Sequence, residues 1–411
     1  MTATDYGQIR QHGAMEGTTP PVDLDAVRMY RLGRIREQLR RFDYAGVLLY
    51  DQLNSRYATD ATNMQVWCSH NEARYTFVPT QGPVVMFEYG PHRHLSEGLP
   101  GVDEVRPTTS WYYFAAGPRF REKVKLWAAE IADLVRQHGG SNRRLAVDRM
   151  GVEGVGALQS EGIEVLDAWE LMETAREIKS ADEIVLMRKA VDVCEQAMTD
   201  MRLKLEPGIT ENALWAQLHE TNIRLGGEWI ETRLLCAGPR TNPWFRESSM
   251  RPIQAGEIMS FDTDLIGPYG YCADISRSWL CGDGKPTDEQ RRVYGLAVEQ
   301  IRHNESLLRP GLGFREFVEK AWEIPDEFLP NRYGSAIHGA GLCDEYPAIG
   351  HKIDWERKGN DGVFEEGMTV CVESYMGSVH GGEGVKLEEQ VLITADGCER
   401  LSQYPLEDGW L

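Results

Sequence analysis

Four short segments in the second half of the chain carry side chains that could do chemistry. They read FDTDLIGPYGYCADISRSW, SAIHGAG, VCVESY and GEGVKLEEQ, and their acids and histidine are Asp262, Asp264, Asp274, His338, Glu373 and Glu388. Taken singly, such an acid is usually solvated and a histidine between glycines usually belongs to a turn. Taken together, these residues are not explained in that way, because IMSFD, VCVE and VKLEE place carboxylates in segments with the apolar pattern of buried strands.

Several buried carboxylates cannot all ionise unless a cation neutralises them. Two divalent ions would bring four positive charges to the five carboxylates, with neutral His338 as a nitrogen ligand. Oxygen-rich donors with one imidazole favour manganese, iron, cobalt or zinc. Asp262 and Asp264 are two residues apart, so on a strand they would face the same way. The pattern predicts a two-metal centre and allows both acids to bind metal or one of them to orient a water.

The elements that must position these side chains follow a repeat. KLEPGITENALWAQL and LLRPGLGFREFVEKAW each join two helical patterns through a Pro-Gly pair. Downstream, GEIMSFD places Asp262 six residues after Gly256, and GMTVCVE places Glu373 six residues after Gly367. Two α+β halves that each present an acid at the same strand position predict a pseudo-twofold domain.

The first part of the chain alternates helical and strand patterns. We predict helices over 28–42 and 121–140, and short buried strands over 45–50, 82–90 and 143–148. This pattern predicts an α/β domain over 1–175. A long helical pattern from Ala181 then opens a second domain over 176–411.

Composition and charge narrow the classes of function. The 411 residues are 42% hydrophobic and 26% charged, as in globular proteins. The net charge of −20 disfavours nucleic acid and anionic membranes as partners and suits a cationic small molecule. The eight cysteines form no CxxC pair, the polar start lacks a secretory pattern, and no apolar run reaches the length of a membrane span. We expect a cytoplasmic enzyme.

The second part resembles the pita-bread fold of methionine aminopeptidases, prolidases, aminopeptidase P and creatinase, the M24 family. The first part is similar to the creatinase/prolidase N-terminal domain, and REIKSADEI at 176–184 resembles the start of the family's catalytic domain. The resemblance implies an α/β creatinase/prolidase-like domain followed by an α+β pseudo-twofold pita-bread domain, and a homodimer. It also implies two metals on two Asp, one His and two Glu. These fall on Asp262, Asp274, His338, Glu373 and Glu388, which argues against a metal-free creatinase-type site.

Three features depart from the peptidases of this family. In CAGPRTNPWFRES, Trp244 stands after a proline where the peptidases carry a histidine. HGAGLCDEYP is one residue shorter than the peptidase segment and has Asp344 in place of its second histidine. The spacing from Asp262 to Asp274 is one residue longer and adds Asp264. This combination resembles the metallopeptidase-like dimethylsulfoniopropionate lyases, which cleave a C–S bond.

That resemblance implies a metal-dependent carbon–sulfur lyase that converts dimethylsulfoniopropionate, a small sulfonium zwitterion, to dimethyl sulfide and acrylate. Asp344 would be the general base. Alternatively, Asp344 would be a further metal ligand or a solvated turn residue. Iron is the metal that the resemblance favours, with zinc or manganese as alternatives. Aromatic faces attract onium groups, and Trp244, Tyr333 and Trp67 are the candidates for binding the sulfonium.

Two other functions are compatible with this fold. An Xaa-Pro dipeptidase or aminopeptidase of the M24 family would need a replacement for the missing histidines, for which His351 and His380 are available. A catalytically inactive binding protein would be expected to have lost metal ligands, whereas every expected ligand is present.

Overall fold

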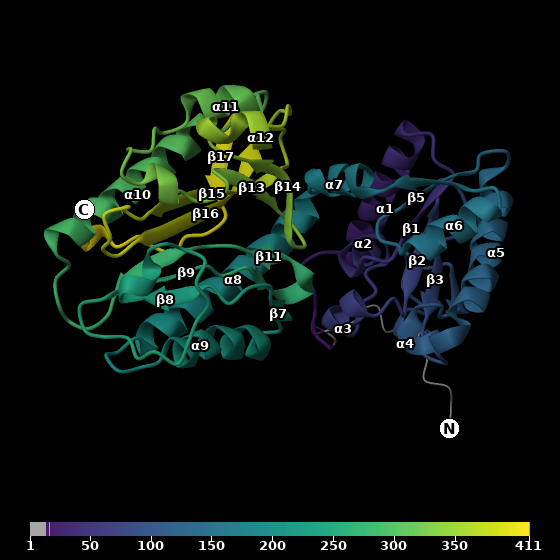
Figure 1. Ribbon diagram of the computed structural model, residues 1–411, viewed down its shortest axis with the longest axis horizontal. Coiled ribbons are helices and arrows are strands. Elements are labelled where there is room, and N and C mark those ends of the chain that lie inside the picture. The colour runs from purple at the N-terminus through teal and green to yellow at the C-terminus, as the bar shows by residue number, and fades with distance from the viewer. Residues whose placement is uncertain (1–13, 16, 411) are drawn as a thin grey trace. The chain divides into compact units, whose positions relative to one another are not determined.

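The computed structural model describes residues 14, 15 and 17–410, and the chain divides into two compact units (Figure 1). The N-terminal unit ends at Arg176, and the C-terminal unit runs from Glu177 to Leu411. All eight cysteines are free. Among the helices of the described residues, none is long and apolar enough to cross a bilayer.

The N-terminal unit is built on a six-stranded mixed sheet in the order β4-β3-β2-β1-β5-β6. The strands are β1 (Gly46–Leu49), β2 (Tyr75–Pro79), β3 (Val85–Glu88), β4 (Glu104–Pro107), β5 (Arg144–Val147) and β6 (Glu164–Asp167). The helices are α1 (Leu24–Arg41), α2 (Gln52–Thr59), α3 (Gln65–His70), α4 (Tyr113–Ala116), α5 (Phe120–Gly139), α6 (Val152–Ser160) and α7 (Trp169–Glu177). The predicted α/β pattern is confirmed.

The burial of apolar side chains explains why the sequence pattern predicted the helices and strands of the N-terminal unit. Trp127 and Ile131 of α5 are fully buried in one cluster with Leu48 and Phe77 of the sheet. The apolar stripe of α5 therefore covers the central strands, as its helical spacing predicts. Helix α1 begins earlier than the predicted residue 28, because Asp23 caps it by accepting a hydrogen bond from the backbone N–H of Asp25.

The C-terminal unit contains two three-stranded sheets, β11-β10-β7 and β12-β9-β8, and a five-stranded sheet, β14-β13-β15-β16-β17. The strands are β7 (Trp229–Ile230), β8 (Leu235–Ala237), β9 (Ile258–Phe261), β10 (Leu265–Ile266), β11 (Cys272–Ala273), β12 (Arg277–Leu280), β13 (Ile337–Ala340), β14 (Asp344–Ile349), β15 (Thr369–Met376), β16 (Val385–Thr394) and β17 (Gly397–Arg400). The helices are α8 (Ala181–Lys204), α9 (Glu211–Arg224), α10 (Asp288–Leu307), α11 (Phe314–Lys320) and α12 (Trp355–Lys358).

The predicted repeat is present in this unit. Helices α8 and α9 flank the first Pro-Gly pair and precede β9, and α10 and α11 flank the second and precede β15. Gly208 (φ +96°) and Gly311 (φ +83°) both have the left-handed backbone that glycine favours. The halves differ where they carry their acids, because Asp262 follows the end of β9 whereas Glu373 lies inside β15.

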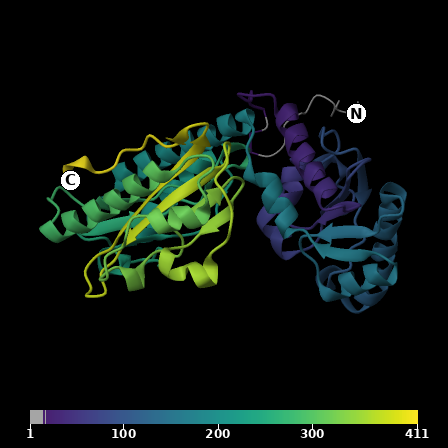
Figure 2. The same cartoon turned by 90° about the horizontal axis from the view of Figure 1, so that it is seen from above.

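Helix α10 covers one face of the five-stranded sheet and lies along β15 and β16 in both views (Figures 1 and 2). Val293, Ala297 and Ile301 of α10 are buried in one cluster with Val370 and Val391 of the sheet. The apolar face of the five-stranded sheet is therefore packed against α10.

A close approach between α8 and the turn after β10 gives a test of this packing. A Cβ at Gly267 would lie 2.7 Å from Cβ and 2.9 Å from Cα of Ala190 in α8. Overpacking of this kind costs about 1–3 kcal/mol, so Gly267→Ala should lower the free energy of unfolding measured in urea by that amount. Gly284→Ala is the matched control, because its new methyl meets nothing within 4 Å. Equal stability of the two variants would contradict the packing.

Candidate metal centre

The predicted ligands come together in the C-terminal unit. They form three overlapping buried groups, and within each group the ligand atoms lie within 4.8 Å of one another. The groups are Asp262, Asp264 and Asp274; Asp262, Glu373 and Glu388; and Asp274, His338, Cys371 and Glu388. Because Asp262, Asp274 and Glu388 each belong to two groups, the cluster is continuous.

The five-stranded sheet positions the histidine and the two glutamates. Glu373 of β15 pairs directly with Glu388 of β16, so their side chains leave the sheet on the same face. On the other side of β15, His338 of β13 lies opposite Cys371. The His338 Nε2 atom is 3.3 Å from Oε1 of Glu373 and 3.3 Å from Oε1 of Glu388. Like charges directly opposite each other destabilise a sheet, so this register requires compensation.

The prediction that Asp262 and Asp264 share one face of a strand is wrong. Strand β9 ends at Phe261, and Asp264 has a left-handed backbone with φ +38°. The turn brings Asp264 back to Asp274, whose Oδ1 atom accepts the Asp264 backbone N–H at 3.2 Å. Thr232 donates its hydroxyl to Oδ2 of Asp264 at 2.6 Å. The residue that lengthens the spacing thus reaches the cluster through a strained turn.

The cluster fits divalent cations. Oε1 of Glu373 and Oε1 of Glu388 are buried, and neither accepts a hydrogen bond from any residue within the described ranges. Burial raises the pKa of Asp262, Asp274 and Glu373, and it raises the pKa of Asp264 to about 7. Carboxyl groups in this state are neutralised either by protons or by a cation. Oxygen donors beside one imidazole are a ligand set that suits divalent transition metals.

Lys386 is a member of the centre that the sequence interpretation missed. Its buried Nζ atom lies 2.6 Å from Oε2 of Glu373, 3.0 Å from Oε2 of Glu388 and 3.2 Å from Oδ2 of Asp262. Burial would raise the pKa of Glu388, but the Lys386 ammonium holds it well below its ordinary value. Lys386 supplies one fixed positive charge and binds the Oε2 atoms, while both Oε1 atoms face His338. A lysine two residues before Glu388 in an apolar strand was the available signal.

Asp344 stands at the edge of the cluster. It is the first residue of β14, its side chain is 54% exposed, and its Oδ1 atom is 3.6 Å from Nδ1 of His338. Desolvation raises the pKa of Asp344, against the opposing charge of His338. Asp344 belongs to none of the three ligand groups found among the described residues, so its carboxylate can accept a proton beside the cluster.

Two of the three predicted aromatic residues lie near the cluster. The Tyr333 ring faces the Lys386 ammonium, with 4.6 Å from Nζ to the ring centroid. Tyr333 packs on a small buried group that includes Trp244 and Tyr375. The indole N–H of Trp244 is buried and donates to no residue in the described part of the chain.

Phe245 is a further aromatic residue at this place, and the sequence interpretation missed it. Phe245 stacks on Tyr333 with ring centroids 5.1 Å apart. It is 58% exposed and has φ +67°. Trp67, by contrast, belongs to α3 of the N-terminal unit, where it is 39% exposed.

The two histidines considered as replacements are not in the ligand groups found among the described residues. The Nε2 atom of His351 is hydrogen-bonded to the carbonyl of Tyr333 at 3.1 Å, and burial lowers the pKa of His351 to about 4. His380 is exposed.

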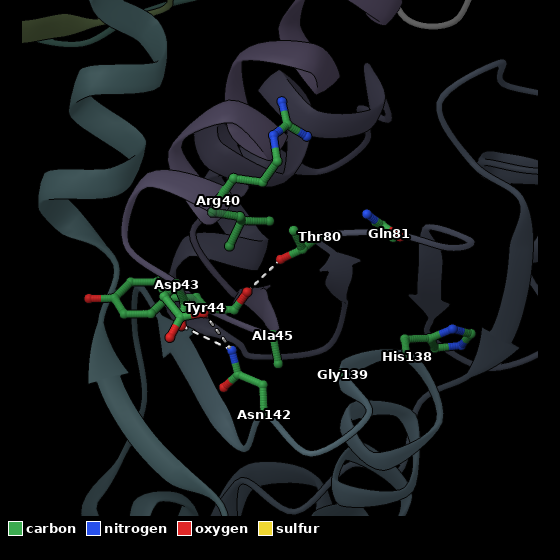
Figure 3. A pocket seen from close by; sticks show the side chains of 10 residues that line it. Arg40, Asp43, Tyr44, Ala45, Thr80, Gln81, His138, Gly139 and Asn142 are labelled. Carbon is green, nitrogen blue, oxygen red and sulfur yellow. Dashed lines mark hydrogen bonds between the residues drawn. The ribbon is translucent and has the colours of Figure 1, made fainter.

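A cavity of about 270 Å³ in the N-terminal unit has a different character (Figure 3). Its walls include Thr80 and Asn142, which donate to the carbonyls of Tyr44 and Asp43. Both side chains are therefore hydrogen-bonded to other residues that line the cavity. None of the predicted site residues is among the lining residues. The three candidate ligand groups all lie in the C-terminal unit.

Comparisons with known proteins place the chain in a family. Residues 185–395 match the model of metallopeptidase family M24. A protein from Roseobacter denitrificans named dimethylsulfoniopropionate lyase DddP is 44% identical over 390 residues, which is 94% of this chain and 87% of that protein. Its namesake from Roseovarius nubinhibens is 43% identical over the same shares.

Solved structures agree on the fold. The Xaa-Pro dipeptidase from Bacillus anthracis has a TM-score of 0.74 at 21% identity, covering 92% of this chain and 99% of its own. The prolidase from Pyrococcus horikoshii OT3 has a TM-score of 0.72 at 18% identity, with the same shares. The predicted creatinase/prolidase-like and pita-bread fold is confirmed. The chain therefore belongs to metallopeptidase family M24 and, within it, to the carbon–sulfur lyases named dimethylsulfoniopropionate lyase DddP.

Proposed function

We propose that this enzyme cleaves dimethylsulfoniopropionate to dimethyl sulfide and acrylate at the C-terminal cluster. The observation that carries the proposal is the position of Asp344, a half-exposed carboxylate beside the ligand histidine, at the edge of a buried metal-binding cluster. The names of the relatives that are 43% and 44% identical support the same substrate.

The residues proposed to hold two divalent ions are Asp262, Asp264, Asp274, His338, Glu373 and Glu388. Four charges from the ions and one from Lys386 would balance the five carboxylates of this set. Iron is the proposed metal, with zinc or manganese as alternatives. When bound, the ions supply Lewis acidity toward the substrate carboxylate and stabilise the charge that develops on it.

The reaction proposed for Asp344 is an elimination. Its carboxylate takes a proton from the carbon next to the substrate carboxylate. The electron pair of that C–H bond forms the C=C bond of acrylate. The C–S bond breaks, and its electrons leave on sulfur as neutral dimethyl sulfide. Only one proton moves, so a single carboxylate base is sufficient and the histidines of the peptidases are not needed.

The proposed sulfonium site is the aromatic group around Tyr333 and Trp244. Tyr333 already binds one ammonium group over its ring, which is the interaction that an onium group needs. Trp67 is proposed as a third contact. The net charge of −20 disfavours nucleic acid and an anionic membrane as partners. We also propose that the enzyme is a cytoplasmic homodimer.

An Xaa-Pro peptidase is the alternative that shares this fold, but neither His351 nor His380 joins the ligand groups found among the described residues. Peptide hydrolysis by the family uses histidines to move protons at the amide. Here Trp244 is buried among aromatic side chains, and His351 is bonded to the backbone of Tyr333.

Asp344→Asn tests the function and the base together. Loss of a general base lowers rates by about 10²–10⁴-fold, so dimethyl sulfide in the headspace above this variant should fall by that factor. Its metal content should stay that of the wild type. Asp361→Asn, which changes an exposed aspartate, is the matched control. Full activity of Asp344→Asn would remove the base role, and a metal-loaded wild type without dimethyl sulfide would overturn the lyase.

Glu373→Gln tests the metal ligands. The amide cannot supply the anionic Oε1 atom at the cluster, so metal retained after dialysis against a chelator should fall by at least about tenfold in elemental analysis. The exposed Glu366, changed to Gln, is the control. Chelator-treated wild type should lose activity and regain it with ferrous, manganous or zinc ions. Unchanged metal content in Glu373→Gln would contradict the proposed ligand set.

A further inference from the structure

A buried ion pair joins two sequence motifs through residues that the proposed chemistry leaves unused. Nζ of Lys179, from REIKSADEI, lies 3.1 Å from Oε2 of Glu345, from HGAGLCDEYP. The two side chains are 3% and 1% exposed. Burying two charges carries a desolvation penalty that only good geometry and further hydrogen bonds offset, so the surroundings of this pair matter.

Both partners are fixed by the backbone around them. The Lys179 backbone N–H donates to the carbonyl of Gly367 at 3.0 Å, in the turn before β15. On the other side, Oε1 of Glu345 accepts the backbone N–H of Leu342 at 2.9 Å. Leu342 lies in the turn between β13 and β14. The Glu345 carboxylate packs so closely against this turn that a Cβ at Gly341 would clash with Oε2 of Glu345.

The pair acts on the residue next to it in the chain. Asp344 and Glu345 are consecutive in β14, so their side chains leave the strand on opposite faces. Asp344 faces His338, with 3.6 Å between Oδ1 and Nδ1, and Glu345 is directed to Lys179. Holding the Glu345 carboxylate at both oxygens therefore sets the rotation of β14 at the residue that carries the proposed base.

We propose that the Lys179–Glu345 pair is a positioning device for Asp344. This rests on the proposed base role of Asp344. Lys179 and Glu345 do not belong to the ligand groups found among the described residues, so they act through the turn and not through the metal. A misplacement of about 1 Å can lower a rate by about 10²-fold, and the anchor prevents a movement of that size.

The test compares Lys179→Met with Lys189→Met, which changes an exposed lysine of α8. In Lys179→Met, kcat for dimethyl sulfide release should fall by roughly 10- to 100-fold with little change in KM, and metal content should be that of the wild type. Amides of residues 341–344 should exchange with deuterium at least about tenfold faster. Lys179→Arg keeps the charge and should recover most of kcat, whereas Lys189→Met should behave as the wild type.

Glu345→Gln provides a second variant if Lys179→Met does not fold. It keeps an acceptor for the Leu342 N–H and removes only the ion pair, so a smaller fall in kcat is expected. Normal kcat in Lys179→Met beside an inactive Asp344→Asn would overturn the positioning role and leave the lyase intact. A wild type that releases no dimethyl sulfide would overturn the lyase and with it the catalytic part of this inference. Faster exchange at 341–344 would then mark the pair as structural only.

Discussion

The concentration of negative charge in one buried cluster is the constraint on which the C-terminal unit depends. Five carboxylates converge there because Glu373 and Glu388 face each other across two strands and the β9–β12 region adds three aspartates. Such a cluster opposes folding unless cations compensate it. Lys386 provides one positive charge within the fold. By binding the Oε2 atoms of Glu373 and Glu388, it also fixes the orientation of their Oε1 atoms. Divalent ions at the cluster would meet the same electrostatic demand, and their binding would then stabilise the folded unit.

The differences from the peptidases follow one chemical logic. Hydrolysis of an amide needs proton transfer to a leaving nitrogen, whereas elimination of a sulfonium needs one base and a neutral leaving group. In this chain Trp244, for which the resemblance implies a histidine in the peptidases, packs in a small buried group with Tyr375, and Asp344 lies beside His338. Asp264 reaches the cluster through a left-handed turn. Relative to the ligand set that the family resemblance implies, the cluster therefore carries one additional carboxylate.

Spacing within single segments carried most of what the sequence could predict. The acids and His338 lie in short strands or beside their ends, so local apolar patterns located them, and the Pro-Gly pairs located the repeat. The turn at Asp264 was read as strand because two-residue spacing does not reveal a positive φ. Lys386 was read as one residue of a strand, although its place two residues before Glu388 put it on the same face. The Lys179–Glu345 pair joins residues 166 positions apart, a contact that one sequence does not encode locally.

Anomalous diffraction from crystals of the purified enzyme, recorded at the absorption edges of its metals, tests the central claim most directly. The account predicts two peaks inside the cluster, with Lys386 still bonded to the Oε2 atoms of the two glutamates. A cluster that binds no metal, with its carboxylates neutralised by protons and Lys386 alone, would contradict it. A single ion would show that the charges are balanced in another way.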